Sequence, residues 1–208
     1  MPRPLIITDC DGVLVEFVRP FTDYLLAEHD LTLSLETFAL AGNIRDAAGN
    51  VLPVADFPPL LQGFFTTHMP RQRAVAGAAD SLAQLAGYCD VVVLTNIADI
   101  HADTRTGVLR QLGMPYRVIS NQGGKGPAIR ALLDEFQPSA SVFIDDLPPN
   151  HSSAAKLAPD VHRLHMVAEH DLRHLIPAAP DAHARIDDWA DALPHIEAQI
   201  TANVGAAA

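Results

Sequence analysis

The feature that most constrains the fold is a regular alternation of short apolar runs with helical patterns. Runs of this kind, ending in polar residues, are typical of buried strands; they lie at 5–7, 91–94, 116–119 and 141–144, with a weaker one at 161–167. Between them, leucines, valines and isoleucines recur at helical spacing. Strands that alternate with single helices form a parallel sheet covered on both faces. We therefore expect an α/β fold with a three-layer, Rossmann-like core.

Residues 15–75 interrupt this alternation, because they contain no clear buried strand. Their pattern predicts helices over 17–28, 33–40 and 60–67, with a loose hairpin around Gly49 and Asn50. The chain is thus divided into a core (1–14 and 76–208) and a small, mostly helical insertion (15–75). Near the other end, 186–196 predicts a helix that Pro194 is expected to split in two.

Composition and charge exclude several classes of function. The formal charge is −11, from 25 acidic against 14 basic residues, so nucleic acid and anionic membranes would be repelled. No apolar run approaches the roughly 18 residues of a membrane span. Cys10 and Cys89 are too few for a disulfide scaffold or a zinc site. We expect a cytoplasmic protein, either monomer or homodimer.

Two acidic residues follow the first apolar run directly. In an extended backbone Asp9 and Asp11 point the same way, beyond the carboxyl end of the strand. Ligands bind at that edge of open α/β sheets. Because two adjacent carboxylates repel each other, the pair is favoured when a cation lies between them or one is protonated. An acidic turn after a strand would look the same.

Three further groups belong to the same predicted edge. Thr95 and Asn96 end the second run and offer polar groups to an anion, and Lys125 lies among glycines just before a helix, where a phosphate would be attracted. Asp145 and Asp146 end a later strand. Two acid pairs supply the carboxylate oxygens that Mg²⁺ prefers.

In this order the motifs IITDCDGVL, VVVLTNI, GGKGPAI and VFIDDLPPN resemble those of the haloacid dehalogenase superfamily. The insertion after the first motif is similar in size and position to that family's type 1 cap. The resemblance implies that Asp9 is the nucleophile and Asp11 the general acid and base, while Thr95 and Lys125, with Asn96 beside them, bind phosphate. It also implies Mg²⁺ held by the Asp9 carboxylate, the Asp11 carbonyl and Asp146, with Asp145 supporting or replacing Asp146.

The residues favour the phosphatase branch of that family. Dehalogenases lack the second acid that Asp11 supplies, and 15–75 contains no lysine for the Schiff base of the phosphonate-cleaving members. The resemblance therefore implies a hydrolase of a small phosphorylated metabolite, acting through an aspartyl-phosphate. A sugar phosphomutase, a nucleotidase and a catalytically silent binding protein remain alternatives. Arg71 and Arg73 are candidates for a second anionic group on the substrate, and His151 for a position near the site.

Overall fold

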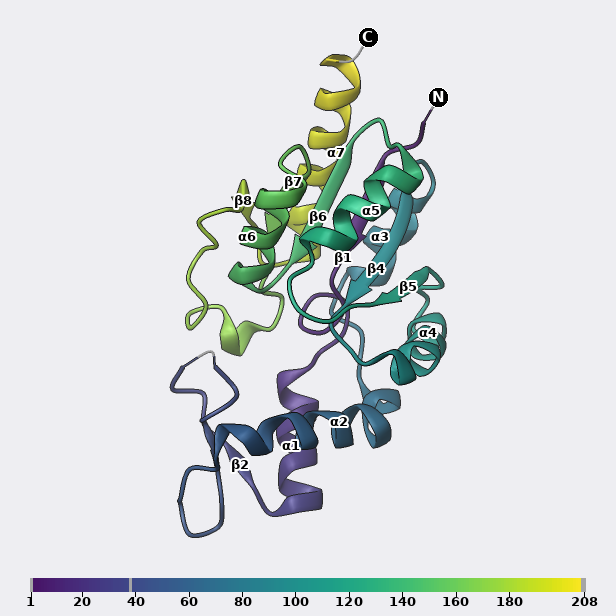
Figure 1. Cartoon of the computed structure of the whole chain (residues 1–208). Coiled ribbons are helices and arrows are strands. Elements are labelled where there is room, and N and C mark those ends of the chain that lie inside the picture. Colours follow the sequence, from purple (N-terminus) through teal and green to yellow (C-terminus); the bar gives the residue numbers. More distant parts are fainter. Residues whose placement is uncertain (1, 38, 207–208) are drawn as a thin grey trace.

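A computed structural model describes residues 2–37 and 39–206, and at its centre lies a six-stranded parallel sheet (Figure 1). The strands are β1 (Leu5–Thr8), β4 (Asp90–Thr95), β5 (Arg117–Ser120), β6 (Ser141–Asp145), β7 (His162–His165) and β8 (Ala184–Arg185). Their order is β5-β4-β1-β6-β7-β8, so the first strand of the chain pairs with both β4 and β6. The expected α/β class and parallel sheet are confirmed, while the short edge strand β8 was not expected.

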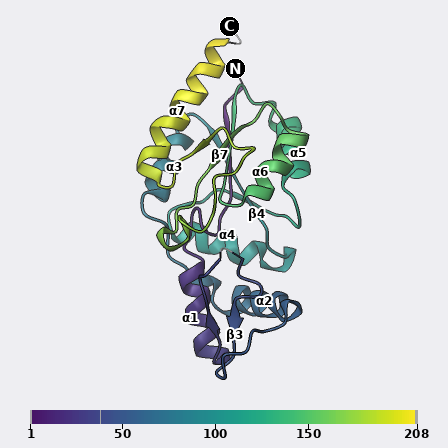
Figure 2. The ribbon, with the colours of Figure 1, turned by 90° about the vertical axis from the view of Figure 1, so that its left-hand side faces the viewer.

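Helices cover both faces of the sheet, because alternate strand residues point to opposite sides. In β1, Ile6 packs with residues of α3 and α7, whereas Leu5 and Ile7 pack with α5 and α6 (Figure 2). The helices around the sheet are α3 (Ala78–Ala86), α4 (Ala102–Gln111), α5 (Gly126–Phe136), α6 (Pro148–Leu157) and α7 (Trp189–Ala206), with 3₁₀ turns η3 (Asp99–His101) and η4 (His170–Leu172). Among the described residues, none of the helices combines the length and apolar character needed to cross a bilayer.

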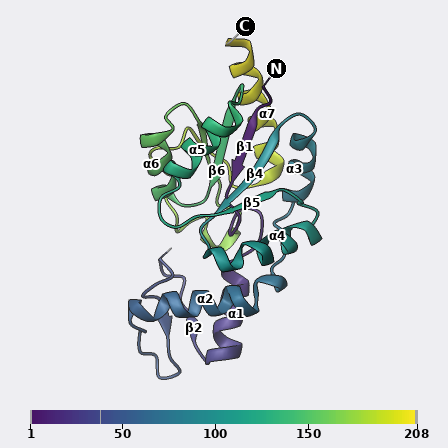
Figure 3. The same ribbon diagram turned by 45° about the vertical axis from the view of Figure 1, so that its right-hand side comes forward.

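The remaining elements lie beyond the carboxyl ends of the central strands (Figures 1 and 3). They are α1 (Val18–His29), β2 (Thr32–Leu33), β3 (Ile44–Arg45), η1 (Val54–Asp56), α2 (Phe57–Thr67) and η2 (Met69–Arg71). An aromatic cluster of Phe21, Tyr24 and Phe64 joins α1 to α2, with ring centroids 5.5 to 6.1 Å apart. Ile97 and Val108 belong to the same apolar cluster, which therefore also packs this unit against the chain after β4.

The helix predicted over 33–40 is wrong for the described residues of that range, outside which Phe38 lies. Thr32 and Leu33 instead form the short strand β2, which pairs antiparallel with β3, and Ser34 N donates to Asn43 O at 2.9 Å. Leu31, Leu33 and Leu35 alternate with polar residues, and this period of two is the spacing of a strand. The hairpin expected around Gly49 is present: Asp46 N donates to Asn50 O at 3.0 Å.

The expected split at Pro194 is also wrong, because α7 runs through it. Proline removes one helical hydrogen bond and crowds the preceding turn. Here buried residues on both sides of Pro194, namely Trp189, Ala192, Ile196 and Ile200, pack in one core. We attribute the continuity of the helix to this packing.

Candidate active site

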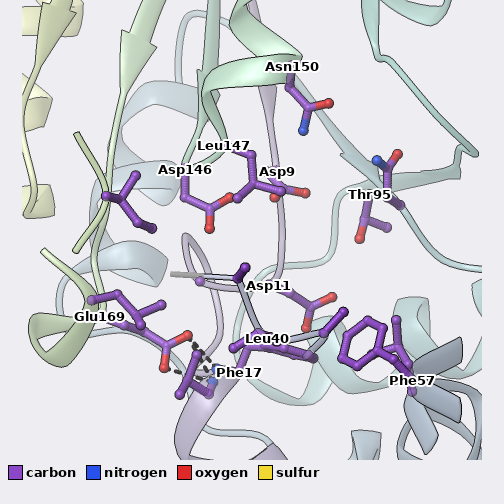
Figure 4. Close-up of a pocket in the computed structure, with 18 of the residues that line it drawn as sticks. Asp9, Asp11, Phe17, Leu40, Phe57, Thr95, Asp146, Leu147, Asn150 and Glu169 are labelled. Atoms are coloured by element: carbon purple, nitrogen blue, oxygen red, sulfur yellow. Dashed lines mark hydrogen bonds between the residues drawn. The ribbon is translucent and has the colours of Figure 1, made fainter. Parts of the chain in front are cut away.

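The carboxyl ends of β1, β4 and β6 meet the start of α5 around a cavity of about 400 Å³. Most of the residues singled out in the sequence line it: Asp9, Asp11, Thr95, Asn96, Lys125 and Asp146 (Figure 4). They come from strand ends and loops far apart in the sequence. Parallel pairing of β1 with both neighbours brings them to one edge of the sheet.

A buried ion triad lies at one side of the cavity. Lys125 Nζ is 2.6 Å from Asp9 Oδ1 and 2.6 Å from Asp145 Oδ2, and the lysine is wholly inaccessible to solvent. Burial alone would lower the pKa of Lys125, but the two carboxylates outweigh it and raise that pKa. The lysine is therefore a fixed cation beside Asp9.

The two acids at the end of β6 have different surroundings. Asp145 Oδ1 accepts hydrogen bonds from Leu147 N and from Asn150 Nδ2, both at 2.9 Å, while its Oδ2 contacts Lys125. Asp146 Oδ1, by contrast, is buried and has no hydrogen-bond partner among the described residues. Asp146 thus has one buried carboxylate oxygen without a hydrogen-bond partner among the described residues, whereas both oxygens of Asp145 have partners.

Asp9, Asp145 and Asp146 form a compact acidic cluster, each offering an oxygen within 4.8 Å of the others. Burial raises the pKa of Asp9 to about 6 against the opposing charge of Lys125. Burial, together with the charges of Asp9 and Asp145, raises the pKa of Asp146 well above its ordinary value. Three carboxylates facing one ammonium leave an excess of negative charge, which a hard divalent cation would neutralise. The unpartnered Asp146 oxygen fits such an ion.

The loop before α5 is held by hydrogen bonds to Asn96, the residue that follows β4. Asn96 Nδ2 donates to Gly123 O at 3.1 Å, and Asn121 Nδ2 donates to Asn96 Oδ1 at 2.6 Å. A Cβ atom on Gly126 would lie only 2.2 Å from Ser153 O, so the first turn of α5 needs glycine to pack against α6. These contacts hold Lys125 in place. Asn96 thus braces the lysine loop as well as lining the cavity.

Asp11 is held by two residues that the sequence analysis missed. Arg105 Nη2 donates to both carboxylate oxygens, at 2.8 and 2.7 Å, and Gln72 Nε2 donates to Oδ1 at 2.7 Å. Gln72 also accepts from Arg105 Nη1 at 2.9 Å, which closes the network. Arg105 lies on the apolar face of α4 with Val108 and Leu109. A charged residue on an apolar face was the signal available in the sequence.

Glu169 is a third residue that the sequence analysis missed. Its carboxylate accepts hydrogen bonds from Phe17 N at 2.9 Å and from Val18 N, so it caps the start of α1 (dashed lines in Figure 4). Burial raises the pKa of Glu169 to about 7, although those two hydrogen bonds oppose the shift. Glu169 joins the inserted unit to the core.

Three of the sequence candidates lie elsewhere. Arg71 and Arg73 line a different hollow, with Glu16 and Asp23, so the structure does not bring them to the cavity. His151 is buried behind the edge of the sheet, with Nε2 3.0 Å from the Asp145 carbonyl oxygen. It supports the end of β6 rather than lining the cavity.

Comparison of the sequence with protein-family models gives no match, and neither does comparison with curated proteins. Solved structures do match. A protein assigned as a phosphoglycolate phosphatase from Lactobacillus plantarum has a TM-score of 0.62 and 15% identity, over 93% of this chain and 99% of that one. A haloacid dehalogenase-type hydrolase from Bacillus subtilis, bound to magnesium, also has a TM-score of 0.62. Its identity is 14%, over 94% of this chain and 99% of that one.

A third similar structure is assigned as a β-phosphoglucomutase, from Thermotoga maritima. Its TM-score is 0.59 and its identity 14%, over 94% of this chain and 99% of that one. Likeness at this level of identity establishes the fold and leaves the reaction open.

Proposed function

We propose that this chain, whose fold is that of the haloacid dehalogenase superfamily, is a magnesium-dependent phosphatase of a small phosphomonoester. The observation that carries the proposal is the buried cluster at the strand ends. Asp9 lies against the fixed cation Lys125, and the neighbouring Asp146 has a buried oxygen without a partner among the described residues. Nucleophile, cation and an acidic ligand thus meet in one cavity, which suits phosphoryl transfer.

The chain's own residues supply the two steps. A carboxylate oxygen of Asp9 bonds to phosphorus while the bond to the leaving oxygen breaks, and Asp11 gives that oxygen a proton. Water then bonds to phosphorus, Asp11 takes its proton, and the bond to Asp9 breaks to release phosphate. Lys125 and Thr95 hold the phosphoryl oxygens, where charge increases in the transition state.

Asp9 and Asp146 would hold magnesium, and Asp145 would orient Lys125 through their ion pair. When bound, the ion supplies positive charge that binds and polarises the phosphoryl group. Carboxylate oxygens without histidine or cysteine partners favour Mg²⁺ over zinc. The magnesium-bound hydrolase with a similar fold supports this choice.

A phosphomutase is the second candidate, since one similar structure is assigned to that class. A mutase must also hold the phosphate at the far end of a sugar bisphosphate. Among the described lining residues Lys125 is the one basic side chain, and it is already paired with two carboxylates. The cavity therefore favours the phosphatase. A silent binding protein is disfavoured, because each of the four motifs is complete.

Phosphate release from p-nitrophenyl phosphate tests the proposal. With Mg²⁺ and no sugar bisphosphate, we expect turnover of roughly 1 per second or more. A chelator should abolish it and added Mg²⁺ should restore it. Asp9→Asn should remove turnover for every substrate, because the amide cannot form the acyl phosphate.

The exposed Asp103 on α4 provides the matched control, and Asp103→Asn should leave turnover unchanged. Activity that survives exhaustive chelation would contradict the metal site. Turnover that requires a sugar bisphosphate and yields an isomerised sugar phosphate would establish the mutase instead.

A further inference from the structure

We propose that the ester cleaved at this site has an uncharged, aromatic leaving group. This inference rests on the proposed phosphatase function and concerns the part of the cavity that faces away from the phosphate. Asp9 and Asp146 lie at one end (Figure 4), and Lys125, which also lines the cavity, is paired with Asp9 there. The opposite end has a different chemical character.

The inserted unit contributes only apolar side chains to the described lining. Phe17, Leu40, Phe57, Leu61 and Phe65 face the cavity, together with valine and alanine residues of the same segment. Aromatic and aliphatic walls of this kind bind a ring through burial and stacking. They offer no hydrogen bond to a hydroxyl group.

The core side of this end is apolar as well. Leu172 and Ile176 line it, and the nearby Glu169 already accepts hydrogen bonds from Phe17 N and Val18 N. A sugar hydroxyl placed here would exchange water for apolar neighbours and leave its hydrogen bonds unmade, which disfavours binding. A polyol leaving group therefore fits poorly.

A charged leaving group fits no better. Asp9, Asp11, Asp146 and Glu169 all line the cavity, while Lys125 is the one cation among the described lining residues. A second phosphate or a carboxylate would therefore find no free partner. This argues against nucleoside diphosphates, sugar bisphosphates and phosphorylated hydroxy acids.

Binding to the Asp9→Asn variant tests the inference without turnover. In the presence of Mg²⁺, titration calorimetry should give a Kd for 1-naphthyl phosphate at least about 10-fold lower than for glycerol 3-phosphate, glucose 6-phosphate or AMP. Equal or weaker binding of the naphthyl ester would overturn the inference.

A matched pair of leucine substitutions locates the binding surface. Leu61→Asn, in the cavity wall, should raise KM for 1-naphthyl phosphate by about 10-fold and should raise KM for acetyl phosphate, which has no ring, by much less. Leu26→Asn, at an exposed position of α1, should alter neither. A Leu61 variant with unchanged KM for the naphthyl ester would contradict the proposed wall; if that variant fails to fold, the calorimetric comparison decides.

The two proposals fail in different ways. If the wild type releases phosphate from no ester while the Asp9→Asn variant still prefers the naphthyl ester, the phosphatase proposal is wrong and the binding inference holds. If the wild type hydrolyses the polar esters as efficiently as the aromatic ones, the phosphatase proposal stands and this inference is wrong.

Discussion

Arg105 is fully buried although it carries a charge, and its environment is built around Asp11. Burial alone would lower the pKa of Arg105, but the carboxylate of Asp11 outweighs this and raises it. The guanidinium therefore stays charged and holds Asp11 in one orientation, with Gln72 as a shared neighbour. In the proposed reaction Arg105 would be a positioning residue, because it would act through its contact with Asp11.

Removal of Arg105 should be costly for stability. Arg105→Met would leave Asp11 without its counter-charge, and breaking a buried ion pair costs about 3–5 kcal/mol, less where water can reach the remaining group. Since Asp11 is 17% exposed, we expect a loss of about 2–4 kcal/mol in the free energy of unfolding, measured by urea denaturation. Arg110→Met, at an exposed position of the same helix, should change it by less than about 0.5 kcal/mol. Equal effects of the two substitutions would mean that the Asp11 contact contributes nothing.

Pre-steady-state kinetics tests the proposed roles of Asp9 as nucleophile and Asp11 as general acid and base. Asp11→Asn should still be phosphorylated by p-nitrophenyl phosphate, because nitrophenolate leaves without a proton. Breakdown of the aspartyl-phosphate should slow by on the order of 100-fold, which gives a burst of one nitrophenol per site. A burst from the Asp9→Asn variant would place the nucleophile elsewhere, and full activity of the Asp11 variant on alkyl phosphates would remove its assigned role.

Helix α1 begins without a side-chain cap of its own and receives one from the core. Glu169 reaches across to Phe17 N and Val18 N, the free amide groups at the start of the helix. A carboxylate there also interacts favourably with the helix dipole. Near the same place, Glu16 N donates to Arg73 O and Val75 N to Leu14 O, both at 2.9 Å. The inserted unit is thus joined to the core by this cap and by two paired connecting segments.

Glu169 should make stability depend on pH. Its pKa is raised from 4.5 to about 7 in the folded chain, so the folded state holds this proton more tightly than the unfolded state. The associated stability is complete below pH 4.5 and is lost as the pH rises to about 7. Glu169→Gln should remove this loss, which we put at about 1–2 kcal/mol after allowance for solvent screening at a half-buried position.

Urea denaturation of both proteins between pH 4.5 and 8 measures the difference. The same exchange at the exposed Glu36 should leave the pH dependence as in the wild type. Parallel curves for wild type and Glu169→Gln would show that Glu169 does not titrate in this range.

At the scale of the whole molecule, the cavity lies where the sheet, the loop before α5 and the inserted unit meet. The end lined by Asp9, Lys125 and Asp146 belongs to the core, and the apolar end is lined mostly by residues of 15–75. An ion bound at the acidic cluster would also reduce the repulsion between carboxylates from β1 and β6. Metal binding should therefore stabilise the entire fold.

Thermal unfolding measures this coupling without reference to activity. At a free Mg²⁺ concentration of 100 times Kd, linkage predicts about 2.7 kcal/mol of stabilisation and a corresponding rise in Tm. Asp146→Asn should remove most of the rise, whereas Asp160→Asn, at an exposed position outside the cluster, should retain it. An equal rise in wild type and the Asp146 variant would indicate screening of surface charge instead of a specific site.

The sequence by itself determined the elements whose signals are local. Buried strands followed by polar residues predicted β1, β4, β5 and β6, and their parallel pairing put Asp9, Thr95, Lys125 and Asp146 around one cavity. Such inferences succeed because a strand's buried run and the loop after it are adjacent in the chain. At 33–40 the prediction overlooked the strand-like alternation of Leu31, Leu33 and Leu35, which fits the pairing of β2 with β3. At Pro194 the local pattern was misleading, because packing on both sides maintains the helix.

Only the tertiary structure decided which side chains hold the catalytic candidates. Gln72, Arg105 and Glu169 lie tens of residues or more from the groups they contact, and no spacing rule relates them to Asp11 or to α1. It also showed that Asp145 and Asp146, two adjacent acids in the sequence, have different surroundings: Asp145 contacts Lys125 and Asn150, whereas Asp146 Oδ1 has no hydrogen-bond partner among the described residues. The physical reason is that hydrogen bonds and burial depend on distances through space, which local sequence patterns do not encode.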